Sequence, residues 1–353
     1  MIDLNDPAAI HAADPDGMLG HILRLPQQLA DGWAAAETVT LPDSFAQAER
    51  LVIAGMGGSA IAGSLLAAVM SPAGRVPVTV VRDYDLPAFA RGPQTLVIAS
   101  SNSGNTEETL STFEQARERG CQLLVTATGG RLGQLAQQHG LPFIRIAYQS
   151  QPRAALGWSL APLLNVAARL NWLPGVRADL EEAISVMRDW CAELAADAPV
   201  TRNLAKREAG QLMGRTVVVF GAGYFAEVAR RWKGQFNENA KAWAAWEVLP
   251  EANHNTLAGK DWPADAAQRV MALFLTGSAD HPRNARRIEL TKNAFMLAGC
   301  NTDVMTARGR SPLAQMLSLV LLGDFMSFYL ALLYGVDPTP IEALVDFKLA
   351  MAG

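Results

Sequence analysis

Residues 51–63 read LVIAGMGGSAIAG, and this stretch decides the fold class. Leu51 to Ala54 is a short apolar run, a glycine-rich turn follows it, and Ala60 to Met70 carries the small and aliphatic residues of a buried helix. The pattern predicts a strand, a glycine turn and a helix. Such a turn brings backbone N–H groups and a helix N-terminus toward an anion, although a tight strand-to-helix turn needs glycine for steric reasons alone.

Further strands and helices alternate after this turn. Runs rich in β-branched residues occupy 76–81, 95–99 and 123–126, and helical patterns occupy 107–119 and 131–139. This alternation predicts a parallel, doubly wound α/β sheet.

A second α/β unit of the same kind begins near the middle of the chain. Residues 216–220, TVVVF, lead into another glycine turn at 221–226 and then into a helical pattern. Later strands are expected at 269–276 and 301–305, and helices at 282–298, 312–334 and 341–350. We therefore expect two such domains in tandem, at 1–153 and 213–353, joined by a helical connector at 154–212.

Composition narrows the class of protein. The chain has 353 residues, 50% of them hydrophobic and 18% charged, with a net charge of −4, which argues against disorder and against a nucleic-acid partner. Cysteine occurs three times, odd in number and widely spaced, so neither a disulfide framework nor a metal site is expected. The acidic N-terminus is unlike a signal peptide, and the apolar stretch 313–334 is interrupted by polar residues, which predicts a buried helix, no membrane span and a cytoplasmic protein.

A run of hydroxyl side chains follows the strand at 95–99. Residues 100–109 read SSNSGNTEET, at the carboxyl end of a central strand, where ligands bind in this fold class. Hydroxyl and N–H groups there would hold a phosphate. Ser103 or Thr106 is also expected to cap the following helix, but capping by one residue does not explain the whole run.

Four motifs together carry a family resemblance. GMGGSAIAG at 55–63 and SSNSGNTEET at 100–109 resemble the sugar isomerase (SIS) domain, a phosphosugar-binding module. RRWKGQFNENAK at 230–241 and PEANHN at 250–255 look like the bifunctional phosphoglucose/phosphomannose isomerase family, and the likeness covers most of the chain. The resemblance implies two tandem SIS-type, flavodoxin-like domains and a homodimer whose active site is shared between subunits. It also implies isomerase activity on glucose 6-phosphate, mannose 6-phosphate and fructose 6-phosphate without metal or other cofactor.

The resemblance also assigns roles to individual residues. Those implied to bind the sugar and its phosphate are Gly57, Gly58, Ser59, Ser101, Ser103, Thr106 and Arg153. Glu238 is implied as the base, His254 as the ring-opening histidine supplied by the partner subunit, and Lys348 as a catalytic lysine. Glu238 stands in a polar Asn-Glu-Asn run after a helical pattern, so we expect it in a loop that faces a cleft.

These residue types suit the chemistry. An aldose–ketose conversion opens the sugar ring and moves a proton between C1 and C2 through a cis-enediol, which a carboxylate can shuttle. An imidazole exchanges protons near neutrality, and a cation stabilises developing negative charge. The alternatives are ordinary ones: Glu238 as a surface carboxylate, His254 as a structural residue and Lys348 as a solvated lysine.

The chain departs from the family pattern at positions beside these motifs. Ser64 and Thr256 stand where acidic residues are frequent, and Asn102 where an aromatic residue is common. The Thr-Pro pair associated with acceptance of the mannose epimer corresponds to Thr339-Pro340. These positions bear on the relative preference for the two aldose phosphates.

Three other functions fit parts of the pattern. A non-catalytic phosphosugar sensor would need the serine loop but no base. The isomerase half of an amidotransferase is disfavoured, because residue 2 is Ile2 and not a cysteine nucleophile. A dehydrogenase would need Asp83 or Asp85 to bind a ribose and would leave the serine loop without a role.

Overall fold

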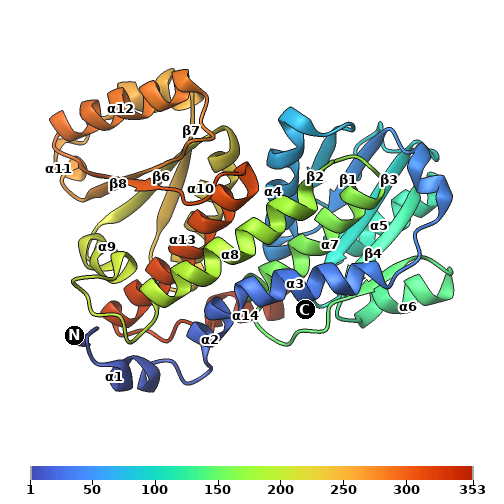
Figure 1. Ribbon diagram of the computed structural model, residues 1–353, viewed down its shortest axis with the longest axis horizontal. Coiled ribbons are helices and arrows are strands. Elements are labelled where there is room, and N and C mark those ends of the chain that lie inside the picture. The colour runs from blue at the N-terminus through green and yellow to red at the C-terminus, as the bar shows by residue number, and fades with distance from the viewer. Residues whose placement is uncertain (1, 352–353) are drawn as a thin grey trace. The chain divides into compact units, whose positions relative to one another are not determined.

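The computed structural model describes residues 2–351, which form two compact units (Figure 1). The sheet A unit comprises residues 24–186 and 309–314, and the sheet B unit comprises residues up to 23, residues 187–308 and residues from 315 onward. The helices α8 (Val176–Leu194) and α13 (Pro312–Tyr334) each contribute residues to both units.

The sheet A unit is built on five parallel strands in the order β2-β1-β3-β4-β5. Their bounds are β1 Arg50–Ala54, β2 Val78–Val81, β3 Thr95–Ser101, β4 Gln122–Ala127 and β5 Phe143–Arg145. The helices of this unit are α3 Leu25–Glu37, η1 Asp43–Gln47, α4 Gly57–Ala73, α5 Glu107–Glu118, α6 Gly130–Gln138, η2 Pro152–Ala154 and α7 Leu156–Arg169. Every residue of the central strand β3 is buried, because helices cover both faces of a doubly wound sheet.

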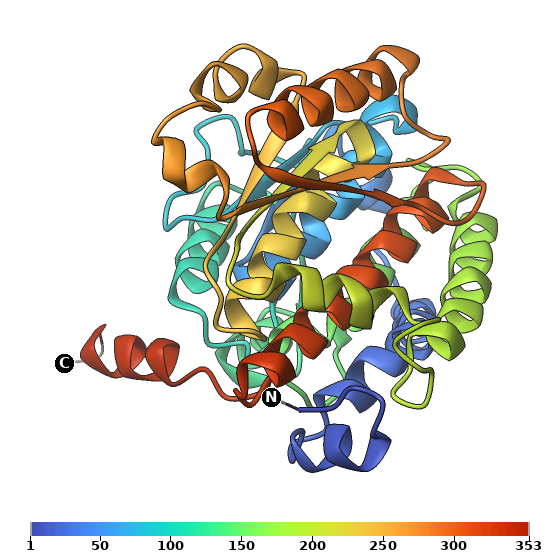
Figure 2. The same cartoon turned by 90° about the vertical axis from the view of Figure 1, so that its left-hand side faces the viewer.

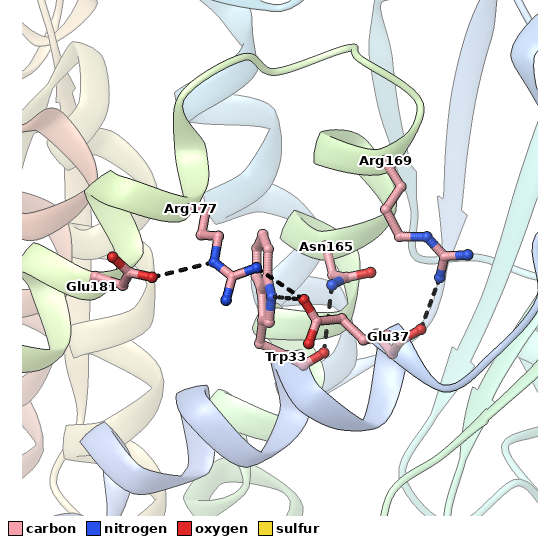
Figure 3. Close-up of polar contacts among 7 residues, drawn as sticks. Trp33, Glu37, Asn165, Arg169, Arg177 and Glu181 are labelled. Atoms are coloured by element: carbon pink, nitrogen blue, oxygen red, sulfur yellow. Dashed lines mark hydrogen bonds and ion pairs between the residues drawn. The ribbon is translucent and has the colours of Figure 1, made fainter.

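Polar contacts tie the helices α3, α7 and α8 together beside this sheet (Figure 3). The indole N–H of Trp33 donates to Glu37 at 2.9 Å, and the Arg177 guanidinium from α8 donates to the same carboxylate at 3.2 Å. From α7, Arg169 donates to the Ala36 carbonyl at 2.9 Å. The carbonyls at the C-terminal end of α3 are thereby satisfied by a cation, as helix ends require.

The sheet B unit has four parallel strands in the order β7-β6-β8-β9. Their bounds are β6 Thr216–Ala222, β7 Ala244–Leu249, β8 Val270–Thr276 and β9 Asn301–Thr306. Its helices are α1 Pro7–Ala12, α2 Met18–Leu23, α9 Leu204–Leu212, η3 Gly223–Phe225, α10 Ala226–Glu238, η4 Glu251–Asn253, η5 Thr256–Gly259, α11 Ala264–Ala267, α12 Pro282–Leu297 and α14 Glu342–Met351.

Helix α13 is long and apolar enough to cross a membrane, yet 94% of its most apolar window is buried inside the protein. Its polar side chains have partners within the sheet B unit: Asp324 receives two hydrogen bonds from Arg231 of α10, at 2.7 and 3.0 Å. The Trp232 indole donates to the Leu319 carbonyl at 2.7 Å. α13 is therefore a core helix, as predicted from its interrupting polar residues.

The predicted fold class is confirmed, and the three cysteines, Cys121, Cys191 and Cys300, are free thiols. Two strands, β5 and β7, were not expected from the sequence, and each is the outermost strand of its sheet. β7 reads AAWEVL and is only partly buried, so it lacks the continuous β-branched run that marks a central strand.

Candidate active site

The first glycine turn lies between β1 and α4, at the carboxyl edge of sheet A. Gly57 has a left-handed φ of +49°, and Met56 at the N-cap provides no side-chain cap for α4. Backbone N–H groups at the start of this helix therefore have no capping side chain, which is the arrangement that binds anions at helix N-termini. Ser59 lies in the first turn and is 3% exposed.

The serine loop joins β3 to α5, next to this turn, because β3 pairs with β1. The Ser101 and Thr106 hydroxyls lie 2.8 Å apart, and the Ser101 hydroxyl also accepts the N–H of Gly104 at 3.1 Å. Gly104 has φ +72°, and a Cβ there would collide with the Gly129 carbonyl oxygen. The loop is therefore packed tightly against the turn after β4, and only glycine fits at its tip.

The expectation that Ser103 or Thr106 caps α5 with its hydroxyl is wrong. Thr106 occupies the N-cap position, but its side chain makes no cap hydrogen bond and turns to Ser101 instead. The Ser103 hydroxyl, which is exposed, accepts the N–H of Asn105 at 3.2 Å. Because capping does not occupy these hydroxyls, they remain beside the start of α5, where an anion is favoured.

Arg153 lies on η2, and this segment packs directly on the glycine turn. A Cβ on Gly58 would lie 2.6 Å from the Pro152 carbonyl oxygen and 3.5 Å from the Arg153 nitrogen. The Arg153 side chain is 3% exposed. The predicted arginine thus belongs to the same edge of sheet A as Gly58, although the sequence separates them by most of a domain.

Ser64, one of the departures from the family pattern, bonds an arginine that the sequence analysis did not single out. Arg82 follows β2 and donates to the Ser64 hydroxyl at 2.7 Å and to the Ala60 carbonyl at 3.3 Å. Ser64 is buried and neutral, so it orients the guanidinium without neutralising its charge. The position of Arg82 directly after a parallel strand is the signal that could have identified it.

Glu238 is the last residue of α10 and not part of a loop, contrary to the expectation from its polar surroundings. The neighbouring asparagines are bonded within the unit: Asn237 donates to the Ala242 carbonyl at 2.8 Å, and Asn239 to the Ser327 hydroxyl at 3.0 Å. The Asn-Glu-Asn run therefore serves to end a helix, with Glu238 half-buried at its C-terminus.

His254 follows η4, just after the end of β7, and its side chain is exposed. The backbone N–H of His254 donates to the Glu251 carbonyl at 2.8 Å, which closes a short turn. Asn255 donates to the Glu251 carboxylate at 3.2 Å and, through its Oδ1, accepts the N–H of Thr256 at 2.6 Å. A neutral Thr256 therefore takes part in the turn that follows the histidine.

Glu238 and His254 lie near opposite ends of the strands of sheet B, Glu238 near the ends where the strands begin and His254 near their carboxyl ends. Ala244, six residues after Glu238, pairs with Val217 near the start of β6, whereas Leu249, five residues before His254, pairs with Ala222 at its end. β7 runs between these two ends, and six residues of strand span roughly 20 Å. The structure therefore does not bring the two side chains together within one chain.

Lys348 lies on α14, and no described residue of this helix is buried. Figure 2 shows α14 standing apart from the strands of its own unit. Within one chain Lys348 is thus presented to solvent. Thr339, on the segment that leads to α14, is 7% exposed and its N–H donates to the Asp337 carboxylate at 2.8 Å.

The predicted residues fall into two groups. The sheet A unit holds those assigned to phosphate and sugar, gathered at one edge of its sheet, and the sheet B unit holds Glu238, His254 and Lys348. Across residues 2–351 no group of three or more His, Cys, Asp or Glu side chains gathers as a metal site would require.

Two family models match the chain. Residues 44–161 match the SIS domain, and residues 201–351 match the bacterial phospho-glucose isomerase C-terminal SIS domain. Among curated relatives, the bifunctional phosphoglucose/phosphomannose isomerase of Caldicellulosiruptor bescii is 37% identical over 95% of this chain and 99% of its own. The protein of the same name from Aquifex aeolicus is 35% identical over 84% of this chain and 89% of its own.

Solved structures share the fold. A hypothetical protein from Thermus thermophilus aligns with a TM-score of 0.72 and 18% identity, over 95% of this chain and 90% of its own. A glucose-6-phosphate isomerase like protein from the same organism aligns with a TM-score of 0.66 and 20% identity, over 98% of this chain and its full length. At these identities the likeness concerns the fold alone.

Proposed function

Because the chain belongs to the bifunctional phosphoglucose/phosphomannose isomerase family, we propose that it interconverts glucose 6-phosphate and mannose 6-phosphate with fructose 6-phosphate. The protein is an aldose–ketose isomerase, an intramolecular oxidoreductase. The substrate is accordingly a sugar phosphate, and a purely phosphosugar-sensing role is not favoured.

The hydroxyls that do not cap α5 are the observation that supports phosphate binding most directly. Two adjacent helices, α4 and α5, begin at one edge of sheet A without a side-chain cap, and Ser101 and Thr106 lie beside the second of them. We assign the substrate's phosphate to the space between the N-termini of α4 and α5, beside Ser101 and Thr106. Ser59, Ser103 and the segment that carries Arg153 surround this position. This phosphate site lies in the sheet A unit, inside the predicted N-terminal domain at 1–153 and before the predicted connector at 154–212.

The proton-transfer residues belong to the second domain, residues 213–353. Glu238 moves the proton between C1 and C2, and His254 exchanges a proton with the ring oxygen as the sugar opens. Lys348 stabilises the negative charge that develops on the enediolate. No cofactor enters this scheme, because the carboxylate and the imidazole account for every proton.

The separation of Glu238 and His254 supports a homodimer with a shared site. β7 alone spans roughly 20 Å between the strand end near Glu238 and the strand end near His254, which disfavours a single site on one chain that uses both side chains. One active site would therefore combine Glu238 of one subunit with His254 of the other. Two apolar residues of α14, Phe347 and Leu349, are 62% and 69% exposed, which favours burial of that helix on a second copy of the chain. We also propose that the protein acts in the cytoplasm.

A single incubation tests the activity. The purified protein is given fructose 6-phosphate without added metal or nucleotide, and glucose 6-phosphate and mannose 6-phosphate are followed separately. If neither product formed, the proposal would be overturned. The ratio of glucose 6-phosphate to mannose 6-phosphate measures the preference between the two aldose phosphates, with which the family resemblance associates Thr339-Pro340.

Two variants test the assigned chemistry. Glu238→Gln should lower kcat about 10²–10⁴-fold while substrate still binds, as expected for loss of a general base. Glu227→Gln, at the start of the same helix, is the matched control. Mixing Glu238→Gln chains with His254→Ala chains should restore activity, because mixed dimers contain one intact site. Mixed dimers without activity would refute the shared site.

A further inference from the structure

The residue before His254 is held by two side chains of α12. The Asn253 amide nitrogen donates to the Thr291 hydroxyl at 2.7 Å, and its amide oxygen accepts from the Arg287 guanidinium at 3.0 Å. A guanidinium only donates, so the amide oxygen must face Arg287 and the amide nitrogen must face Thr291. Both polar ends of the Asn253 side chain are therefore fixed, and its orientation has no alternative.

Burial strengthens this attachment. Thr291 is 2% exposed, and Ala252, on the other side of Asn253 from the histidine, is 1% exposed. Ala252 packs in the same apolar cluster as Ile288, which lies on α12 between Arg287 and Thr291. One helix thus contacts the loop through an apolar residue and through an adjacent polar residue, while His254 remains exposed.

We propose that Arg287 and Thr291 are positioning residues that act through Asn253 to fix the backbone of His254, so that its imidazole meets the substrate bound to the partner subunit in one orientation. This inference rests on the proposed function. In this role neither side chain needs to touch the sugar. Their contribution is to restrict the histidine, since a displacement of about 1 Å at a reacting group can cost about a hundredfold in rate.

The chain offers a matched pair of arginines for the test. Arg287 bonds Asn253, whereas the adjacent Arg286 bonds Glu289 on the exposed side of the same helix. Arg287→Gln should lower kcat about ten- to a hundredfold with KM within about twofold, and Arg286→Gln should change neither. Thr291→Val, which removes the hydroxyl, should lower kcat similarly, and Thr291→Ser, which keeps it, should restore the rate.

A double-mutant cycle separates positioning of His254 from a general structural effect. If Arg287 acts through the histidine, Arg287→Gln should have no further effect on kcat in a His254→Ala chain, because interacting residues are not additive. The same loss of kcat in both backgrounds would overturn the proposal. So would a loss of rate in Arg286→Gln equal to that in Arg287→Gln.

The His254→Ala variant by itself tests the proposed function. If that variant kept the full isomerisation rate, His254 would have no catalytic role and the positioning proposal would fall with it. A different result would be a slow His254→Ala variant in which Arg287→Gln lowers kcat by the same factor as in the parent chain. That result would leave the catalytic role of His254 intact and refute only its positioning by Arg287 and Thr291. Thermal unfolding of each variant confirms that the compared chains are folded.

Discussion

The hydroxyl of Thr106 lies 2.8 Å from that of Ser101, and not over the N-terminus of the helix that Thr106 precedes. Thr106 therefore gives up the usual stabilising cap, which is typically about 1 kcal/mol, at the edge of sheet A where ligands bind. This geometry is consistent with hydroxyls that bind an anion, and removing the hydroxyls tests that role.

Thr106→Val should raise KM for fructose 6-phosphate about tenfold or more, because a hydrogen bond to a charged group contributes about 1.5–3 kcal/mol. The effect on folding should be limited to about 1 kcal/mol, since the valine has nearly the same shape, no cap is lost and only the hydrogen bond to Ser101 is removed. Ser111→Ala, which removes a hydroxyl farther along α5, is the control. Steady-state kinetics and thermal unfolding of both variants decide the matter, and an unchanged KM in Thr106→Val would exclude this hydroxyl from phosphate binding.

Sequence patterns predict what is determined locally. The run from Leu51 to Met70 predicts β1, its turn and α4, because strand, glycine and helix signals follow one another without interruption. The expectation of a loop at Glu238 fails. Its asparagine neighbours are typical of loops, but Asn239 donates to Ser327 on α13, a helix far away in the sequence. The partners of Asn253 are likewise beyond the reach of sequence patterns, since tertiary packing brings α12 to that loop.

Glu208 provides a pH-dependent contribution to folding. Burial, together with the charge and hydrogen bond of Asp303, raises the pKa of the Glu208 carboxyl to about 7. Because the folded-state pKa lies above the unfolded one, the protonated form is favoured by folding. Its stabilisation is complete below about pH 4.5 and is lost as pH rises through about 7.

Glu208→Gln should therefore be more stable than the parent chain above pH 7, by about 1–3 kcal/mol, and the difference should shrink toward pH 4.5. Denaturant unfolding at a series of pH values measures this difference directly. Glu289→Gln, at an exposed site on α12, is the control for replacing a glutamate by a glutamine. A pH-independent difference between the parent and Glu208→Gln chains would contradict the shifted pKa.

Lys348 should matter for catalysis and hardly at all for the stability of the fold. Its helix buries no described residue, so Lys348→Ala should change the free energy of unfolding by no more than about 0.5 kcal/mol. If Lys348 stabilises the enediolate, kcat should fall about 10²-fold or more, and Lys348→Arg should recover part of it. Lys292→Ala on α12 is the control, and a Lys348→Ala chain with full kcat would remove this lysine from the site.

The pair of Arg231 and Asp324 should be the most sensitive charged contact in the sheet B unit. Their side chains are 3% and 5% exposed, with the closest approach at 2.7 Å, so Asp324→Asn removes the negative charge of this pair from beside a buried guanidinium. The expected cost is about 3–5 kcal/mol. Glu289→Gln breaks the exposed pair with Arg286 and should cost no more than about 1 kcal/mol.

A double replacement distinguishes an unpaired charge from a packing defect at the same position. Changing Arg231 to Met and Asp324 to Leu removes both charges together, and apolar side chains in place of a buried ion pair are often neutral or stabilising. The double variant should therefore unfold at a higher denaturant concentration than Asp324→Asn alone. If it were less stable than the single variant, the contact between α10 and α13 would depend on the shape of the two side chains more than on their charges.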